Sequence, residues 1–168
     1  SPAPDKWQGS ANDDRVNQAN ALGAWANDQW PNEAVFLVGD LNAYSAEDPI
    51  LKLNEYGYTR VMDYLAATTG SDSYLNLTTY QFQSMHGSLD QALGNAKALE
   101  MVNDATVYQI NASEAIALEY SRYNNYLDIY WDESQYRSSD HDPVKIGVKV
   151  GDDSSVPHDA TPVPMEDG

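Results

Sequence analysis

Apolar residues near the start of the chain follow two different periods, and each period predicts a different element. From Asp13 or Asp14, either of which could cap a helix, to about Asn27, apolar residues recur at three- and four-residue spacing, which predicts an amphipathic helix. Residues 34–38 are a continuous apolar run rich in β-formers and ended by Gly39. Such a run predicts a strand buried on both faces, as in a sheet covered by helices.

Less regular signals predict the other elements. Asp48 is expected to cap a short helix that has Pro49 in its first turn and Ile50, Leu51 and Leu53 pointing inward. The other expectations are strands within residues 74–82, 88–93, 105–110 and 144–150, a short helix over 96–102, irregular structure over most of 58–82 and a surface excursion over 113–135. Strands and helices in this order predict an α/β fold.

The chain divides into one domain and a tail. Its 168 residues are enough for one hydrophobic core, and we assign residues 1–150 to that domain. Residues 151–168 are rich in Pro, Asp and Ser and have no apolar period, which predicts an acidic tail or linker. No apolar run approaches the length that spans a bilayer, so we expect no membrane insertion.

The acidic composition narrows the range of partners. The formal net charge is −17, with 9 Lys and Arg against 26 Asp and Glu, and there is no cysteine. A surface of this charge repels polyanions at long range, which disfavours simple electrostatic capture of nucleic acid and suits cation binding. Without cysteine, neither a disulfide nor a thiolate metal site can form.

Polar side chains cluster where predicted strands begin or end. Asp40 and Asn42 follow the first strand, and in extended backbone they would point to the same side. There they could bind a water molecule or a phosphate oxygen. The alternative is that this Asp-x-Asn sequence only forms a turn or caps a helix.

A second cluster contains a histidine between two acids, directly before the last predicted strand. Asp90 could orient His141 by accepting one ring N–H, which would fix the tautomer of the imidazole. Asp140 or Asp142 could hold a hard divalent cation through oxygen ligands. A purely structural His–Asp pair is the alternative interpretation of this cluster.

Three motifs, in order, resemble those of a known family. Residues 38–43 (Val-Gly-Asp-Leu-Asn-Ala), 87–90 (Gly-Ser-Leu-Asp) and 139–143 (Ser-Asp-His-Asp-Pro) are similar to the last three motifs of the endonuclease/exonuclease/phosphatase superfamily, which has the DNase I-like fold. The likeness is greatest to secreted bacterial nucleases of the ExeM type. It extends from about Arg15 to Val150.

The resemblance implies a fold, a reaction and a set of roles. The fold would be the C-terminal portion of a DNase I-like four-layer α/β sandwich, and the reaction metal-dependent hydrolysis of DNA or RNA phosphodiesters outside the cell rather than in the periplasm. Asp40 would position or activate the attacking water, and Asn42 would bind the phosphate. Asp90 would orient His141, and His141 would hydrogen-bond a phosphoryl oxygen or assist proton transfer. Asp140 would bind Mg²⁺, with Ca²⁺ or Mn²⁺ as alternatives.

The family's first motifs have no counterpart in this chain. They include the Glu that is the principal metal ligand in the family, whereas Glu33 lies in a predicted turn too close to Asp40. The resemblance therefore implies that the N-terminal half of the domain is missing and that an apolar sheet face is exposed. We expect a partner to cover it, either the missing half or copies of this chain, and we expect the chain alone to be inactive.

Two other functions stay open on the sequence alone. A phosphatase or phosphodiesterase acting on lipid or sugar phosphates would use the same residues. A non-catalytic descendant of the nuclease fold, acting in binding or self-assembly, would account for the missing Glu, the exposed sheet face and the 12 tyrosines.

Overall fold

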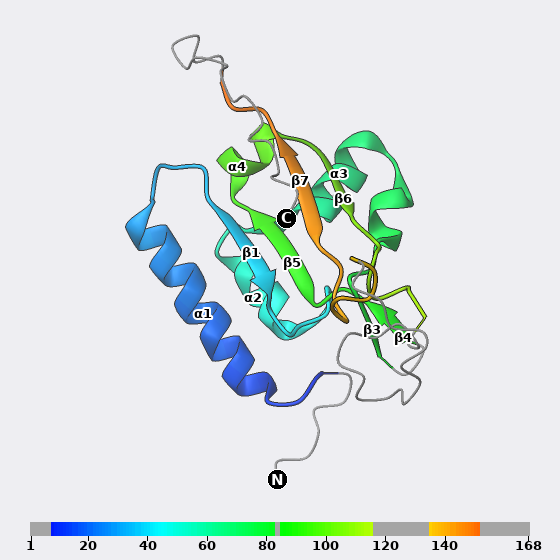
Figure 1. Cartoon of the computed structure of the whole chain (residues 1–168). Helices are drawn as coiled ribbons and strands as arrows, with labels where there is room; N and C mark the ends of the chain where they lie inside the picture. The colour runs from blue at the N-terminus through cyan, green and yellow to red at the C-terminus, as the bar shows by residue number, and fades with distance from the viewer. Residues whose placement is uncertain (1–7, 83–84, 116–134, 152–168) are drawn as a thin grey trace, which may run out of the picture.

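The computed structural model describes residues 8–82, 85–115 and 135–151, and they form the predicted mixture of helices and strands (Figure 1). The predicted α/β class is therefore confirmed. In chain order the elements are α1 (Asn12–Gln29), β1 (Phe36–Asp40), α2 (Asp48–Glu55), β2 (Thr59–Arg60), α3 (Val61–Thr69), the 3-10 turn η1 (Asp72–Asn76), β3 (Tyr80–Phe82), β4 (Met85–Gly87), β5 (Asp90–Gly94), α4 (Ala96–Met101), β6 (Val102–Val107) and β7 (Val144–Val148).

The strands form three antiparallel groups. β5 is the centre of a three-stranded sheet, with β1 on one side and β2 on the other. The register of β1 and β5 sets Val38 opposite Ala92 and Asp40 opposite Asp90. The pairs β3–β4 and β6–β7 form two further small sheets. Two predicted site residues, Asp40 and Asp90, therefore lie directly opposite each other at one end of the central sheet.

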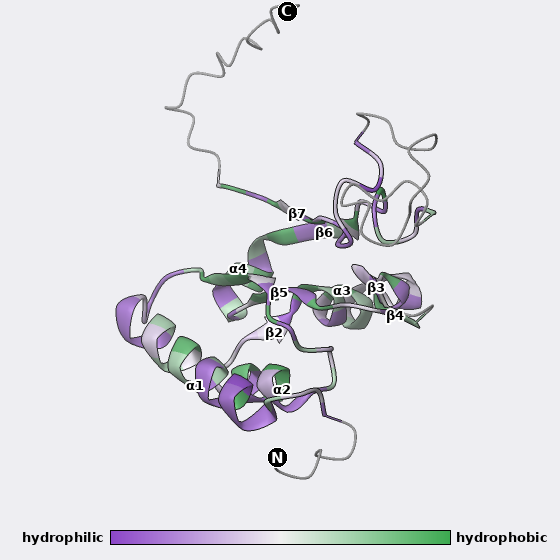
Figure 2. Cartoon of the chain, turned by 60° about the horizontal axis from the view of Figure 1, so that its bottom comes forward, coloured by the Kyte–Doolittle hydropathy of each residue, from purple (hydrophilic) through white to green (hydrophobic). Residues whose placement is uncertain are grey.

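The two faces of the central sheet are covered by different elements. Figure 2 shows α1 and α2 on one side of the sheet and β6 and β7 on the other. The first core packs Leu37 and Leu93 against α1 and α2, and the second packs Ala92 against α3 and the β6–β7 pair. The sheet thus has apolar side chains buried on both faces, but β1 and β5 do not share the burial equally.

Strand β1 differs from its prediction because one of its faces is open. Leu37 is buried, whereas Val38 on the opposite face is 65% exposed. β1 is an edge strand of the central sheet. The covering strand β7 contacts β5, the strand next to β1. The prediction of a strand buried on both faces was therefore wrong for β1, since the covering strands do not enclose it.

Helix α2 has a narrower buried face than predicted. Ile50 and Leu53 are buried, but Leu51 is 48% exposed. Leu51 is two residues from both Pro49 and Leu53, which places it about 160° from each around the helix and outside the buried face that they share with Ile50. The prediction that Leu51 points inward was wrong for this reason.

Helix α3 occupies a segment for which irregular structure was predicted. Its Val61, Met62 and Leu65 enter the second core, and Gly70 ends it in a left-handed conformation at φ 72°. Arg60 precedes the helix without a side-chain cap. The sequence therefore has no capping residue that marks the start of this helix. The burial of its apolar side chains stabilises the helix instead.

The first helix also begins without the predicted cap. Ala11, in a left-handed conformation, precedes α1 and makes no side-chain capping bond, and Asp13 and Asp14 lie inside the first turn. No helix in the part of the chain that the structure describes combines the length and apolarity needed to cross a membrane. The predicted tail lies almost entirely outside the described residues, as does most of the predicted excursion.

Candidate functional site

The predicted contact between His141 and Asp90 is present. His141 Nδ1 lies 2.7 Å from Asp90 Oδ2, and the two side chains are 26% and 21% exposed. Asp90 is the first residue of β5, and His141 lies just before β7. The contact therefore joins two different sheets. When Nδ1–H donates to the carboxylate, the second ring nitrogen, Nε2, remains for a ligand.

A buried threonine holds the two sides of this pair together. Thr79 is 1% exposed, and its hydroxyl accepts the Asp90 N–H at 3.2 Å. Its carbonyl accepts the Asp142 N–H at 2.8 Å. The next residue, Tyr80, forms an isolated β-bridge with His141, and their rings lie 4.6 Å apart between centroids. Sequence reasoning missed Thr79 and Tyr80, because their partners are far away along the chain.

Asp40 and Asn42 are joined by a turn rather than by extended backbone. Asn42 has a φ of 47°, and its backbone N–H donates to Asp40 Oδ1 at 2.8 Å. Its side-chain Nδ2 also donates to Asp40 Oδ2, at 3.3 Å. The predicted extended geometry was wrong, since the Asp40 carboxylate folds the backbone back on itself. The pair nevertheless forms, and both residues are exposed.

The two pairs lie at the same end of the central sheet. Asp40 is the register partner of Asp90, which in turn contacts His141. Burial raises the pKa of the Tyr80 phenol above its ordinary value, and the negative charges of Asp140 and Asp40 raise it further. Asp140 directly precedes His141 in the chain, so it lies near the same end of the sheet. All five predicted site residues therefore gather around the end of β1 and β5.

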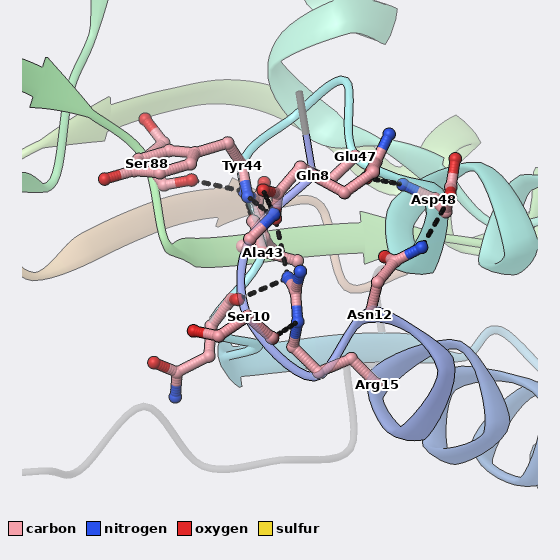
Figure 3. A network of polar contacts seen from close by, with 12 residues as sticks. Gln8, Ser10, Asn12, Arg15, Ala43, Tyr44, Glu47, Asp48 and Ser88 are labelled. Atoms are coloured by element: carbon pink, nitrogen blue, oxygen red, sulfur yellow. Dashed lines mark hydrogen bonds and ion pairs between the residues drawn. The ribbon is translucent and has the colours of Figure 1, made fainter. Parts of the chain in front are cut away.

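A buried ion pair anchors the loop that carries Asn42 (Figure 3). Arg15 Nη1 donates to Glu47 Oε2 at 2.6 Å and to the Asn42 carbonyl at 2.7 Å. The Arg15 and Glu47 side chains are only 12% and 10% exposed. Glu47 also accepts the backbone N–H groups of Gly9 at 2.7 Å and Tyr44 at 3.2 Å. Helix α1 is thereby fastened to the loop.

A buried amide connects the same loop to the start of β5. Gln91 is 3% exposed, and its Nε2 donates to the carbonyls of Ala43 at 3.0 Å and Ser88 at 2.6 Å. Its Oε1 accepts from Arg60 Nε at 2.9 Å. Gln91 satisfies two acceptors and one donor at once, and it fixes the spacing between the Asn42 loop and Asp90.

The residues present offer a metal ion only part of a ligand set. Across residues 8–82, 85–115 and 135–151, no group of three or more His, Asp or Glu side chains is placed to hold a metal. Asp140 is half-buried and provides one carboxylate, a hard oxygen ligand of the kind that Mg²⁺ prefers. Mg²⁺ often binds through one or two carboxylates while keeping several waters, so Asp140 fits such an ion as a single ligand.

An open recess of about 300 Å³ lies beside the Asp40–Asn42 turn. It is lined by both residues of the pair and by side chains of α1 and α2, including Leu22 and Leu53. A ligand at the turn would therefore have free space on the helical side. A larger recess between α1 and α2 contains none of the predicted site residues.

Comparisons with protein-family models, with curated proteins and with solved structures found no match to this chain.

Replacing Glu47 by Gln should lower the free energy of unfolding by about 3–5 kcal/mol, because it leaves the buried Arg15 guanidinium without its counter-charge. Urea denaturation measures this change. Glu55→Gln is the matched control, since Glu55 pairs with Lys52 at the surface and is 66% exposed. That control should cost at most about 1 kcal/mol. Equal effects of the two variants would contradict the anchoring role of Glu47.

Proposed function

We propose that this chain carries part of a metal-dependent phosphodiester hydrolysis site, and that it belongs to an extracellular nuclease acting on DNA or RNA. The observation that carries the proposal is the position of the His141–Asp90 pair beside the Asp40–Asn42 pair. An oriented imidazole, a carboxylate and an amide close together are the groups that phosphoryl chemistry uses.

Each side chain has a role that its contacts support. Asp90 holds His141 by Nδ1, so Nε2 is the nitrogen left for the phosphate: in the doubly protonated ring it would donate to a phosphoryl oxygen, and in the neutral ring it would accept a proton. Asn42 has a second amide N–H besides the one that it donates to Asp40, and this group would bind a phosphate oxygen. The exposed Asp40 carboxylate would position or activate the attacking water.

The expected metal would be held by Asp140 together with ligands from outside the described residues. Mg²⁺, or alternatively Ca²⁺ or Mn²⁺, would neutralise the negative charge that develops on the phosphate. The resemblance to the endonuclease/exonuclease/phosphatase superfamily supports this assignment, as it supports a four-layer sandwich and secretion. These three expectations depend on that likeness.

His141→Ala is the direct test of the proposed chemistry. In the assembled protein, meaning this chain with the segment that covers it, the parent should nick supercoiled plasmid DNA with Mg²⁺ and stop when EDTA is added. Loss of the imidazole should slow cleavage by about 10²–10⁴-fold, the usual contribution of a proton-transfer group.

His86→Ala provides the control for that assay. His86 is exposed on β4 and has no assigned role, so its removal should leave the cleavage rate unchanged. Cleavage by His141→Ala at the parent rate, or cleavage that persists in EDTA, would contradict the proposal.

Two features of the surface support a partner that covers β1, although α1, α2 and the β6–β7 pair already cover most of the two faces of the central sheet. Val38 is 65% exposed and lines an open groove of about 180 Å³ together with apolar residues of β5 and β7, among them Ala92, Val144 and Ile146. Within the described residues, β1 pairs only with β5, which leaves its outer edge unpaired. An exposed strand edge beside an apolar face favours association. We propose that the N-terminal half of the domain covers this face, and that copies of the chain do so without it.

A non-catalytic binding function is the second candidate, and the arginines favour it. In the described part of the chain, Arg15, Arg60 and Arg137 all donate to groups of the chain itself. These contacts already engage the three guanidinium groups, which disfavours their binding a phosphate. The net charge of −17 is also unfavourable for binding a polyanion. A nuclease built on this chain would need cations from its partner. Nothing in the structure favours a phosphatase acting on lipid or sugar phosphates.

Light scattering of the isolated chain tests the exposed face. We expect a mass above that of the monomer, and we expect Val38→Lys to restore the monomer at little cost in stability, because Val38 is largely exposed. Leu75→Lys is the control, since Leu75 is 51% exposed on η1 and outside the groove, and it should still associate. A parent chain that is monomeric with a native-like near-UV spectrum would overturn the idea.

A further inference from the structure

Asp142 is a buried carboxylate that the proposed chemistry does not use. The residue is 2% exposed, and its Oδ1 accepts three successive backbone N–H groups. They are those of Ile110 at 3.0 Å, Asn111 at 2.7 Å and Ala112 at 3.1 Å. A buried carboxylate is costly unless hydrogen bonds compensate for the lost water. These three donors do so, and they fix the chain just beyond β6.

The middle residue of that group reaches back to His141. Asn111 is 4% exposed, and its Nδ2 donates to the His141 carbonyl at 2.7 Å. Its Oδ1 accepts the Ser138 N–H at 3.1 Å. Asp142 therefore accepts from the backbone of Asn111, and the Asn111 side chain donates to the carbonyl of His141. The peptide bond from His141 to Asp142 closes this cycle of contacts. A shift of any member would move the other two.

The same segment is held a second time by a buried arginine. Arg137 is 5% exposed, and its Nη1 donates to the carbonyls of Asn111 at 2.8 Å and Ala112 at 3.4 Å. Its backbone N–H donates to the Ile110 carbonyl at 3.0 Å. The backbone N–H and carbonyl groups of residues 110–112 thus form hydrogen bonds with residues 137–142. Asn111 contacts the backbone of His141, whereas Asp90 contacts its imidazole.

We propose that Asp142 is a positioning residue for His141 and acts through Asn111. Asp90 fixes the imidazole from the ring side, at Nδ1, and Asp142 and Asn111 fix it from the backbone side. The 2.7 Å contact between Nδ1 and Asp90 requires both constraints. If the backbone of His141 moved, its imidazole would no longer reach the Asp90 carboxylate at that distance. The value of this positioning for catalysis rests on the proposed function of His141, but the positioning itself does not.

The test follows the His141 Nδ1–H proton by NMR in the ¹⁵N-labelled chain. A hydrogen bond to Asp90 shifts this proton downfield and slows its exchange with water. In Asp142→Asn and in Asn111→Ala we expect exchange to accelerate on the order of tenfold, as for the weakening of one buried hydrogen bond. Asp104→Asn is the control of equal charge change. Asp104 is exposed on β6, accepts from the Tyr74 hydroxyl and should leave the proton unchanged.

Asn111→Ala keeps the test decisive if Asp142→Asn fails to fold. It removes only the bonds of the Asn111 side chain and leaves the backbone N–H groups on Asp142 in place. The proposal is overturned if the folded variants show the parent shift and exchange rate, since Asp142 would then only stabilise the loop. The readout needs no substrate, so a protein that cleaves nothing would count against the proposed function and not against this positioning.

Discussion

The candidate site depends on one buried residue, Thr79, which is hydrogen-bonded to the segments that lead into two different sheets. Its hydroxyl takes the N–H of Asp90, at the start of β5, and its carbonyl takes the N–H of Asp142, ahead of β7. The His141–Asp90 contact spans the same junction. With 1% of its surface exposed, Thr79 is shielded from water, so both bonds lack competition from solvent. Together with the β-bridge between Tyr80 and His141, these bonds fix the imidazole relative to the Asp90 carboxylate.

Throughout the site, buried polar side chains hold in place the more exposed side chains to which we assign chemical roles. The Asn42 turn is held by Arg15 and Gln91, and His141 is held by Asn111. Such networks stabilise only when nearly every member is satisfied. Among the described side chains, the buried atoms without a partner include Arg15 Nη2 and Arg137 Nε. Both belong to the arginines that hold these loops.

The sequence predicted the α/β class and the contact between His141 and Asp90. The His141–Asp90 contact could be expected because the acid and the imidazole lie at strand ends, where a sheet brings distant residues together. For Asn42 the sequence left two geometries open, extended backbone and an Asp-x-Asn turn, and the structure has the turn, with Asn42 at a φ of 47°. Helix α3 and the exposed Val38 were missed since packing decides both. Thr79 gave no signal at all, because its role depends on partners 11 and 63 residues away.

Direct observation of phosphate binding tests the central claim, that Asn42 and His141 form one phosphate-binding site. The measurement is an NMR titration of the ¹⁵N-labelled chain with a thymidine dinucleotide in the presence of Mg²⁺. We expect saturable shifts of the Asn42 side-chain amide and the His141 ring, while the Asn12 amide, which donates to Asp48, stays in place. Saturable shifts centred elsewhere, or none at Asn42 and His141, would contradict it.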